Sequence, residues 1–174
     1  MNWITKIIKA GEKIKTAVRE RVTAKDLAAS PWTSCSCLSG PMLKKDLKAN
    51  LFVCPSCQKH HRISPKDRFS ILFSNNYEII KTPIPKDDVL GFSDTKSYKD
   101  RLKSARKNTG LDCSMVVATG ALNKINITAI ASEFGFLGAS VASAEGEAFL
   151  AAAQHAIENK HPLVVFTAGG GMRM

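Results

Sequence analysis

Four cysteines near the start of the chain have the residue type and spacing to hold a metal ion. Cys54 and Cys57 form a C-x-x-C pair, whose turn directs two sulfur atoms toward one tetrahedral ion. Cys35 and Cys37 are one residue too close together for the same turn. Structural zinc is usually held by four such ligands at ~2.3 Å, with paired cysteines typically separated by two to four residues. The pattern therefore predicts a zinc-ribbon-like module with one structural zinc per chain, whose ligands are Cys35, Cys37, Cys54 and Cys57.

Alternatives to a zinc-loaded module remain open. The module could be a degenerate ribbon that keeps its fold but binds metal weakly or not at all. His60 and His61 could act as substitute ligands, or they could be exposed polar residues. A disulfide framework is least favoured, because the chain has an odd fifth cysteine, Cys113, and no secretory signal.

A second candidate for chemistry is the run of three glycines, Gly169, Gly170 and Gly171, which follows an apolar segment at 162–166. Glycine N–H groups between a buried strand and a helix can approach a ligand closely, since no Cβ blocks them. The helix end adds partial positive charge. Such donors can stabilise an oxyanion by about 2.7–4 kcal/mol each. A tight strand-to-helix turn without catalytic function would explain the same glycines.

Charge is distributed unevenly along the chain. The net charge is +10, but residues 1–110 carry 22 basic and 10 acidic side chains, whereas residues 111–174 carry 3 basic and 5 acidic ones. A positive surface of this kind could serve nucleic acid, an anionic cofactor or solubility. Few aromatic residues lie among the basic ones, and nucleic-acid-binding surfaces usually contain them.

Hydrophobic periodicity and turn residues predict an α/β core with helices packed on a sheet. Residues 2–21 are expected to form an amphipathic helix used for docking. The longest apolar runs are too short to cross a membrane, and no signal peptide is present, so a soluble cytoplasmic protein is expected. The other expected elements are helices that begin at Ser64-Pro65, at 97–108 and at 144–159, and strands at 77–80, 115–118, 125–130 and 162–166, with a turn around 120–124.

Several stretches of the chain share their residues, in order, with one family. The chain opens with Met1-Asn2-Trp3-Ile4, and Trp32-Thr33-x-Cys35 is followed by Cys54-Pro55-x-Cys57. Further along are Ser97-Tyr98-Lys99-Asp100-Arg101-Leu102 and Glu133-Phe134-Gly135-Phe136-Leu137-Gly138-Ala139-Ser140. The last stretch is Phe166-Thr167-Ala168-Gly169-Gly170-Gly171-Met172-Arg173-Met174. In these residues and their spacing, the whole chain resembles the β subunit of bacterial acetyl-CoA carboxylase carboxyltransferase.

The resemblance implies an incomplete crotonase-like ββα spiral core at 63–174. A zinc-ribbon-like module at 32–62 and an N-terminal helix and linker at 1–31 would precede it. It implies transfer of a carboxyl group from carboxybiotin to acetyl-CoA, forming malonyl-CoA for fatty-acid synthesis. Gly170 and Gly171 match the family's oxyanion glycines and are the predicted catalytic residues. The implied partners are the carboxyltransferase α subunit in an α2β2 assembly, the biotin carboxyl carrier protein and biotin carboxylase.

Two departures from the family pattern bear on these expectations. Leu38 stands where the family's second zinc cysteine belongs, with Cys37 one place early. Family members also continue well past the glycine motif, so the chain is expected to be a fragment or a truncated product with little or no activity on its own. The other functions left open are a basic zinc-ribbon protein that binds nucleic acid or regulates, and an inactive remnant.

Two further features have both a functional and a structural interpretation. The small residues Gly138-Ala139-Ser140 could let a pantetheine arm lie against the backbone, or they could allow close packing. The basic helix could offer charge to the phosphates of CoA, or it could be a solvated face. Its cations are Lys99, Arg101, Lys103, Arg106 and Lys107.

Overall fold

The computed structural model describes residues 30–37 and 40–173, which belong to two compact units, Met1–His61 and Arg62–Met174. The amphipathic helix expected at 2–21 lies outside the described residues. The division at residues 31 and 62 that was expected from the sequence stays a prediction.

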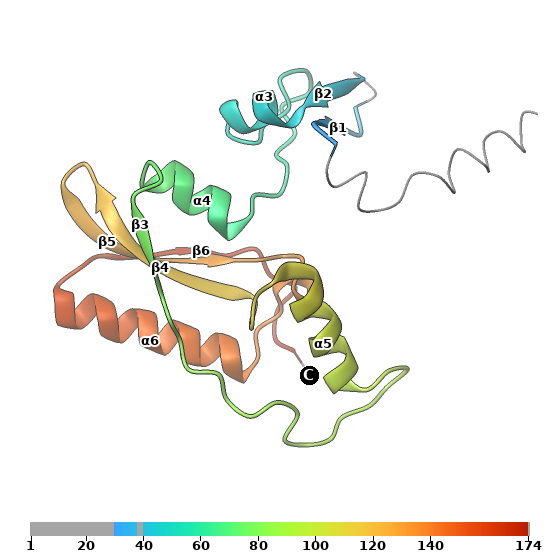
Figure 1. Ribbon diagram of the computed structural model, residues 1–174, viewed down its shortest axis with the longest axis vertical. Helices are drawn as coiled ribbons and strands as arrows, with labels where there is room; N and C mark the ends of the chain where they lie inside the picture. Colours follow the sequence, from blue (N-terminus) through green and yellow to red (C-terminus); the bar gives the residue numbers. More distant parts are fainter. Residues whose placement is uncertain (1–29, 38–39, 174) are drawn as a thin grey trace, which may run out of the picture. The chain divides into compact units, whose positions relative to one another are not determined.

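The described part of the first unit is a small hairpin followed by a short helix (Figure 1). Strand β1 (Trp32–Ser34) pairs antiparallel with β2 (Pro41–Leu43), and α3 (Lys44–Ala49) follows directly. After α3 the chain folds back on itself, with an isolated antiparallel bridge between Val53 and His60. These short elements position the four cysteines.

The second unit is built on a four-stranded sheet with the order β3-β4-β5-β6 (Figure 1). Strand β3 (Tyr77–Ile80) is antiparallel to β4 (Met115–Leu122), which is antiparallel to β5 (Ile125–Ser132). Strand β6 (Leu163–Phe166) is parallel to β5. A parallel neighbour needs a crossover connection, and a helix supplies it here.

The turn expected around 120–124 is shorter than predicted. Strand β4 continues through Gly120 to Leu122, and only Asn123 and Lys124 form the connection, with φ of 50° and 69°. Two successive positive φ angles are characteristic of a tight two-residue hairpin turn. A Cβ on Gly120 would lie 2.7 Å from Cδ1 of Phe73, so this glycine makes room for packing rather than for a turn.

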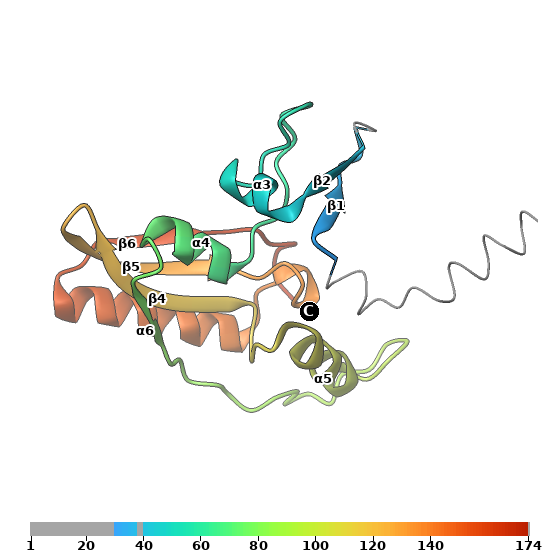
Figure 2. The same ribbon diagram turned by 45° about the horizontal axis from the view of Figure 1, so that its top comes forward.

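Helices α4 (Pro65–Leu72) and α6 (Ser143–Asn159) cover opposite faces of the sheet (Figure 2). On one face, Phe69 and Phe73 pack with the core alanines Ala118 and Ala129. Because side chains alternate along a strand, neighbouring positions point to the other helix.

The opposite face of the sheet is closed by α6. Ala148 and Ala152 of this helix pack against Val117 and Ile130 of the sheet. Small side chains on α6 allow the helix to approach the strands closely, and this seats its first turn beside the start of β4.

Helix α5 (Tyr98–Thr109) begins and ends as its sequence predicts. The Ser97 hydroxyl accepts a hydrogen bond from the Asp100 N–H, and Gly110 closes the helix with a φ of 70°. These are the usual signals of a helix start and of a left-handed C-cap. Leu102 and Ala105 pack on Phe136, just before the one-turn 3-10 helix η1 (Leu137–Ala139).

Strand β6 differs from its sequence expectation. Its apolar run predicts a strand buried on both faces, yet all four of its residues are half-buried. The reason is its position, because among the described residues β6 pairs only with β5 and ends the sheet. None of the helices in the described ranges has the length and apolar character needed to span a bilayer.

Candidate functional site

The four cysteines predicted as metal ligands lie together in the first unit. Their sulfur atoms are all within 4.8 Å of one another. The Sγ atoms of Cys35 and Cys57 are 3.6 Å apart, and those of Cys37 and Cys54 are 3.8 Å apart. Cys37 therefore reaches the cluster despite its short spacing from Cys35.

The cluster has the dimensions of a tetrahedral metal site. With metal–sulfur bonds of ~2.3 Å, the edges of a regular tetrahedron are about 3.8 Å. Both sulfur–sulfur distances, 3.6 Å and 3.8 Å, lie close to this value. Four thiolates at this spacing match the donor set of structural zinc, so the cluster can bind a metal ion such as zinc.

Backbone N–H groups point at the sulfur atoms of the C-x-x-C pair. The N–H of Cys57 bonds to the Cys54 sulfur and lowers the pKa of that thiol. The N–H of Lys59 has the same tendency at Cys57, but desolvation and the neighbouring thiols outweigh it and raise the pKa of Cys57 to about 12. The Cys57 thiol thus resists ionisation, and metal binding would release its proton.

The two histidines that could substitute for cysteine are not part of the cluster. Within the described ranges, the metal-binding group contains only the four cysteines. His60 is exposed, and the buried Nε2 of His61 has no hydrogen-bond partner. The assignment of Cys35, Cys37, Cys54 and Cys57 as ligands stays a prediction that this geometry supports.

The predicted catalytic glycines lie in a bend of the second unit that follows β6. The Gly170 N–H donates to the Gly138 carbonyl at 3.0 Å, and the Val141 N–H donates to the Gly171 carbonyl at 2.8 Å. The Arg173 N–H completes the pairing by donating to the Val141 carbonyl at 2.7 Å. The bend is thus attached to the segment 138–141.

The two predicted oxyanion donors differ in availability. The Gly170 N–H is engaged by the Gly138 carbonyl, whereas the Gly171 N–H has no acceptor among the residues that the structure describes. Gly171 has a φ of +101°, a conformation that side chains rarely allow. Of the predicted pair, only the Gly171 N–H is therefore free among the described residues, and the catalytic role of the pair stays a prediction.

The small residues at 138–140 are used for close packing. A Cβ on Gly169 would lie only 2.8 Å from the Ala139 carbonyl oxygen. Gly138 itself has a φ of +66° and accepts the hydrogen bond from Gly170. Of the two interpretations, close packing therefore explains this segment directly.

Arg173 connects the bend to its surroundings. Its Nε donates to the Ser140 hydroxyl at 3.0 Å, and one terminal nitrogen donates to the Ser140 carbonyl at 2.6 Å. The other terminal nitrogen donates to the Tyr98 hydroxyl at 2.8 Å. The guanidinium also pairs with the Glu145 carboxylate at 3.0 Å.

Glu145 is the buried anion of this network, with a side chain that is 0% exposed. It accepts hydrogen bonds from the N–H groups of Ser114 and Ala142, each at 2.9 Å. Burial acts to raise the pKa of Glu145, but these bonds and the charge of Arg173 outweigh it, so the pKa is lowered. Glu145 is therefore an ionised carboxylate at neutral pH.

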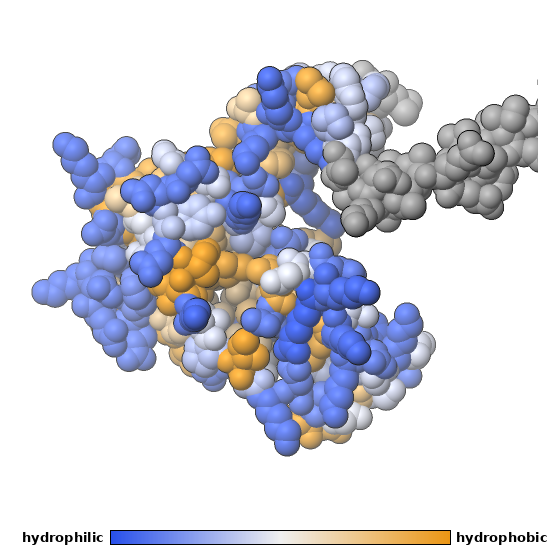
Figure 3. Space-filling view, in the orientation of Figure 1, coloured by the Kyte–Doolittle hydropathy of each residue, from blue (hydrophilic) through white to orange (hydrophobic). Residues whose placement is uncertain are grey.

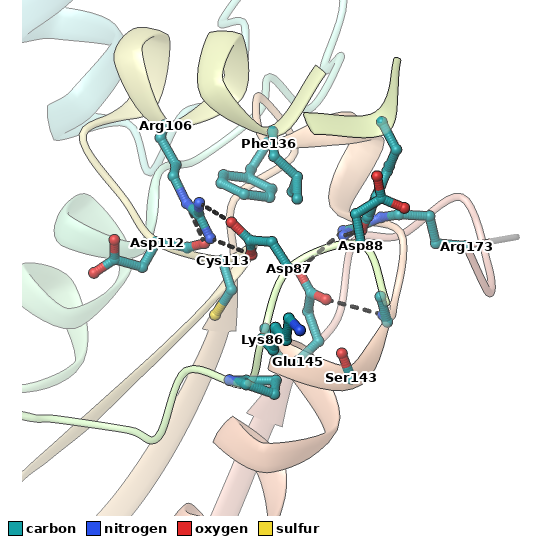
Figure 4. Close-up of a pocket in the computed structure, with 15 residues that line it drawn as sticks. Lys86, Asp87, Asp88, Arg106, Asp112, Cys113, Phe136, Ser143, Glu145 and Arg173 are labelled. Atoms are coloured by element: carbon teal, nitrogen blue, oxygen red, sulfur yellow. Dashed lines mark hydrogen bonds and ion pairs between the residues drawn. The ribbon is translucent and has the colours of Figure 1, made fainter. Parts of the chain in front are cut away.

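A small cavity of about 30 Å³ lies between this network and α5. Figure 4 shows Arg173 and Glu145 at one side of the cavity and Arg106 at the other. Arg106 forms a two-pronged ion pair with Asp87, at 2.5 Å and 2.8 Å. The hydrogen bonds from Arg106 lower the pKa of Asp87, and this pair fixes the loop before α5.

Ion pairs neutralise part of the basic helix. Arg106 is paired with Asp87, and Arg101 with Asp94, whose pKa falls to about 2 because Arg101 and the Lys96 N–H donate to it. Hydrophilic residues cover the visible face of α5 in Figure 3. The other cations of α5 are exposed and form no ion pair with any residue that the structure describes; they are Lys99, Lys103 and Lys107. Binding of CoA phosphates or nucleic acid by this helix stays a prediction.

Sequence reasoning missed the Arg173–Glu145 pair. A glutamate at the third position of a helix is a known signal, because its side chain can accept from the N-cap N–H. Glu145 occupies this position in α6 and makes this bond. Its pairing with Arg173 is a long-range contact that no local pattern reveals.

Comparison with known proteins shows which proteins this chain is similar to. No protein-family model matches it. The acetyl-coenzyme A carboxylase carboxyl transferase β subunit of Pelagibacter ubique (strain HTCC1062) is 61% identical over 175 residues, covering 100% of this chain and 56% of that protein. Over its whole length, this chain is therefore similar to part of a named carboxyl transferase β subunit.

Less similar relatives also align over the whole of this chain. The carboxyl transferase β subunit of Maricaulis maris (strain MCS10) is 38% identical over 174 residues, covering 100% of this chain and 54% of the relative. That of Jannaschia sp. (strain CCS1) is 38% identical over 175 residues, covering 53% of the relative. The chain thus spans about half the length of the carboxyl transferase β subunits that it matches.

A solved structure with partial similarity is the β subunit of P. aeruginosa geranyl-CoA carboxylase. It aligns with a TM-score of 0.45 and 16% identity, covering 75% of this chain and 23% of that chain. The described residues form a mixed α/β fold.

Proposed function

We propose that this chain forms part of a carboxyl transferase β subunit that transfers a carboxyl group from carboxybiotin to acetyl-CoA, giving malonyl-CoA. The observation that carries the proposal is the 61% identity to a named β subunit over the whole chain. The part at 63–174 would be the first portion of a crotonase-like ββα core, and β4, β5 and α6 have the order of one such unit. The parts at 1–31 and 32–62 would be an N-terminal helix and a zinc ribbon.

The chemistry requires stabilisation of an enolate. When CO2 leaves carboxybiotin, the biotin nitrogen keeps the electron pair and can take a proton from the acetyl methyl group. The carbanion then forms a carbon–carbon bond to CO2. The main obstacle is the negative charge that develops on the thioester oxygen. Each preorganised N–H donor can lower the energy of this charged state by about 2.7–4 kcal/mol.

Two features of the bend support this role. The Gly171 N–H has no acceptor among the described residues. The backbone of Gly171 has a positive φ, and the hydrogen bonds between the bend and Val141 maintain this conformation. The Gly170 N–H can serve as a second donor only if its bond to Gly138 opens. We therefore expect Gly171 to be the donor that acts first.

The zinc ribbon has a structural role in this proposal. Cys35, Cys37, Cys54 and Cys57 would hold one zinc ion, which supplies cross-linking energy to a unit with few buried residues. The expected partners are the α subunit in an α2β2 assembly, the biotin carboxyl carrier protein and biotin carboxylase.

The direct test is a carboxyl transfer assay on the subunit purified together with its partner subunits. Acetyl-CoA and a carboxybiotinylated carrier should give malonyl-CoA, and acetyl-CoA alone should slow amide exchange in 169–173. Absence of both malonyl-CoA and protection in a correctly assembled complex would reject the function.

A further inference from the structure

Three hydrogen bonds between 138–141 and 170–173 fix the path of the glycine bend. One is the bond from the Gly170 N–H to the Gly138 carbonyl, and the other two, both at Val141, form the isolated parallel bridge between Val141 and Met172. Main-chain bonds of this kind hold the two segments at one distance, but few neighbours cover the bend, because residues 167–172 are exposed. A further element is needed to keep the exposed bend in one conformation.

The Arg173 side chain supplies this element. Its guanidinium donates hydrogen bonds to the hydroxyl and the carbonyl of Ser140. It donates a third hydrogen bond to the hydroxyl of Tyr98 in α5. The side chain is only 11% exposed. Because the guanidinium is planar and always charged, these bonds define its orientation as a lysine could not.

The counterion of Arg173 is equally constrained. Glu145 is fully buried and receives two backbone N–H bonds, one from Ser114 at the start of β4 and one from Ala142. A buried ion pair is stable only when good geometry and further hydrogen bonds offset the desolvation of its two charges. Glu145 therefore connects the bend, through Arg173, to the sheet and to the first turn of α6.

We propose that Arg173 is a positioning residue for carboxyl transfer, which holds the Gly171 N–H where the thioester oxygen develops charge. This rests on the function proposed above. Arg173 does not touch the reacting atoms in this role. It acts through Ser140, Tyr98 and Glu145, which together hold the bend in place.

The test compares Arg173→Met with Arg68→Met in the assembled enzyme. Arg68 also lies near an aromatic ring, 5.0 Å from the centroid of Phe166, but among the described residues its side chain forms no hydrogen bond or ion pair with the bend. Since a displacement of about 1 Å at a reacting centre can cost about 100-fold in rate, Arg173→Met should lower kcat by about that factor. KM for acetyl-CoA should change by less than about threefold, and Arg68→Met should change neither constant appreciably.

Two further measurements separate positioning from general loss of structure. Added guanidinium ion should restore part of kcat to Arg173→Met and have no such effect on Arg68→Met. Amide exchange at Val141 and Arg173 should accelerate at least about tenfold in Arg173→Met relative to the control. If Arg173→Met does not fold, Tyr98→Phe can replace it, because this variant removes only the hydrogen bond between Arg173 and the Tyr98 hydroxyl. It should show a smaller loss of kcat and a smaller acceleration of amide exchange.

The possible outcomes separate the positioning role of Arg173 from the proposed carboxyl transfer activity. The proposal would be overturned if Arg173→Met had the kcat and the amide exchange rates of the wild type. The same outcome in Tyr98→Phe would overturn it where that variant replaces Arg173→Met. A wild-type complex that makes no malonyl-CoA would reject the proposed function, and the exchange measurement would still decide whether Arg173 holds the bend.

Discussion

Alanine substitutions at the three consecutive glycines should have three different effects, because each glycine has a different environment. At Gly169 a Cβ would lie 2.8 Å from the Ala139 carbonyl oxygen, a backbone atom that cannot rotate away. At Gly171 there is free space, but the φ of +101° strains any residue with a side chain. At Gly170 the nearest atom to a Cβ is the Gly138 oxygen at an ordinary 3.6 Å, and φ is not in the positive region.

The expected magnitudes follow from these environments. Gly169→Ala should lower the free energy of unfolding by about 1–3 kcal/mol, the usual cost of a forced steric overlap. Gly171→Ala should lower it by about 1–3 kcal/mol through backbone strain. Gly170→Ala should range from no change to a gain of about 1 kcal/mol, because alanine restricts the unfolded chain.

The assay is urea denaturation of the whole chain followed by circular dichroism, with amide exchange at Val141 as the local measurement. Exchange of the Val141 amide should accelerate in Gly169→Ala and Gly171→Ala, since its acceptor is the Gly171 carbonyl. A Gly170→Ala variant as unstable as Gly169→Ala would refute the reasoning, because it would mean that the close approach to Ala139 does not determine the bend.

Two other predictions concern the metal and the buried carboxylate. The purified chain should contain about one zinc ion, and Cys37→Ser should abolish zinc binding because the Cys37 sulfur lies 3.8 Å from that of Cys54. The matched control Cys113→Ser should retain the zinc. Zinc retained in Cys37→Ser would exclude the C-x-C pair as a chelate. Because the folded pKa of Glu145 is lowered, its stabilising contribution is complete above the ordinary carboxyl range and is lost as pH falls through the folded value. Glu145→Gln should therefore cost about 3–5 kcal/mol of unfolding free energy at pH 7, measured in urea, by leaving Arg173 buried without its counterion, and this cost should shrink toward pH 3; a cost independent of pH would contradict the assigned ionisation.

The sequence predicts the elements of the second unit well, because their signals are local. Ser97 and Gly110 mark the ends of α5, and the apolar segments at 115–118 and 125–130 mark the positions of β4 and β5. The sequence does not place Gly120 correctly, because glycine is common in turns, and the close contact with Phe73 that requires glycine in the strand is not visible in the local sequence. That neighbour comes from a distant part of the chain.

The candidate sites show the same limit. The cysteine cluster could be predicted because ligand spacing is a local property, although Cys37 departs from the usual spacing. The pairing of the glycine bend with 138–141, and the Arg173–Glu145 contact, could not be predicted, since both depend on where α6 brings the chain back to the sheet. Local patterns identify the glycines but not the carbonyl that already engages Gly170.

The bond between Gly170 and Gly138 closes a loop that contains the whole of α6. A ligand that requires this bend in its ordered form would therefore shift the local opening equilibrium of α6 as well, by linkage. Occupancy of the bend should be detectable at a distance, as slower opening of a helix that the ligand never touches.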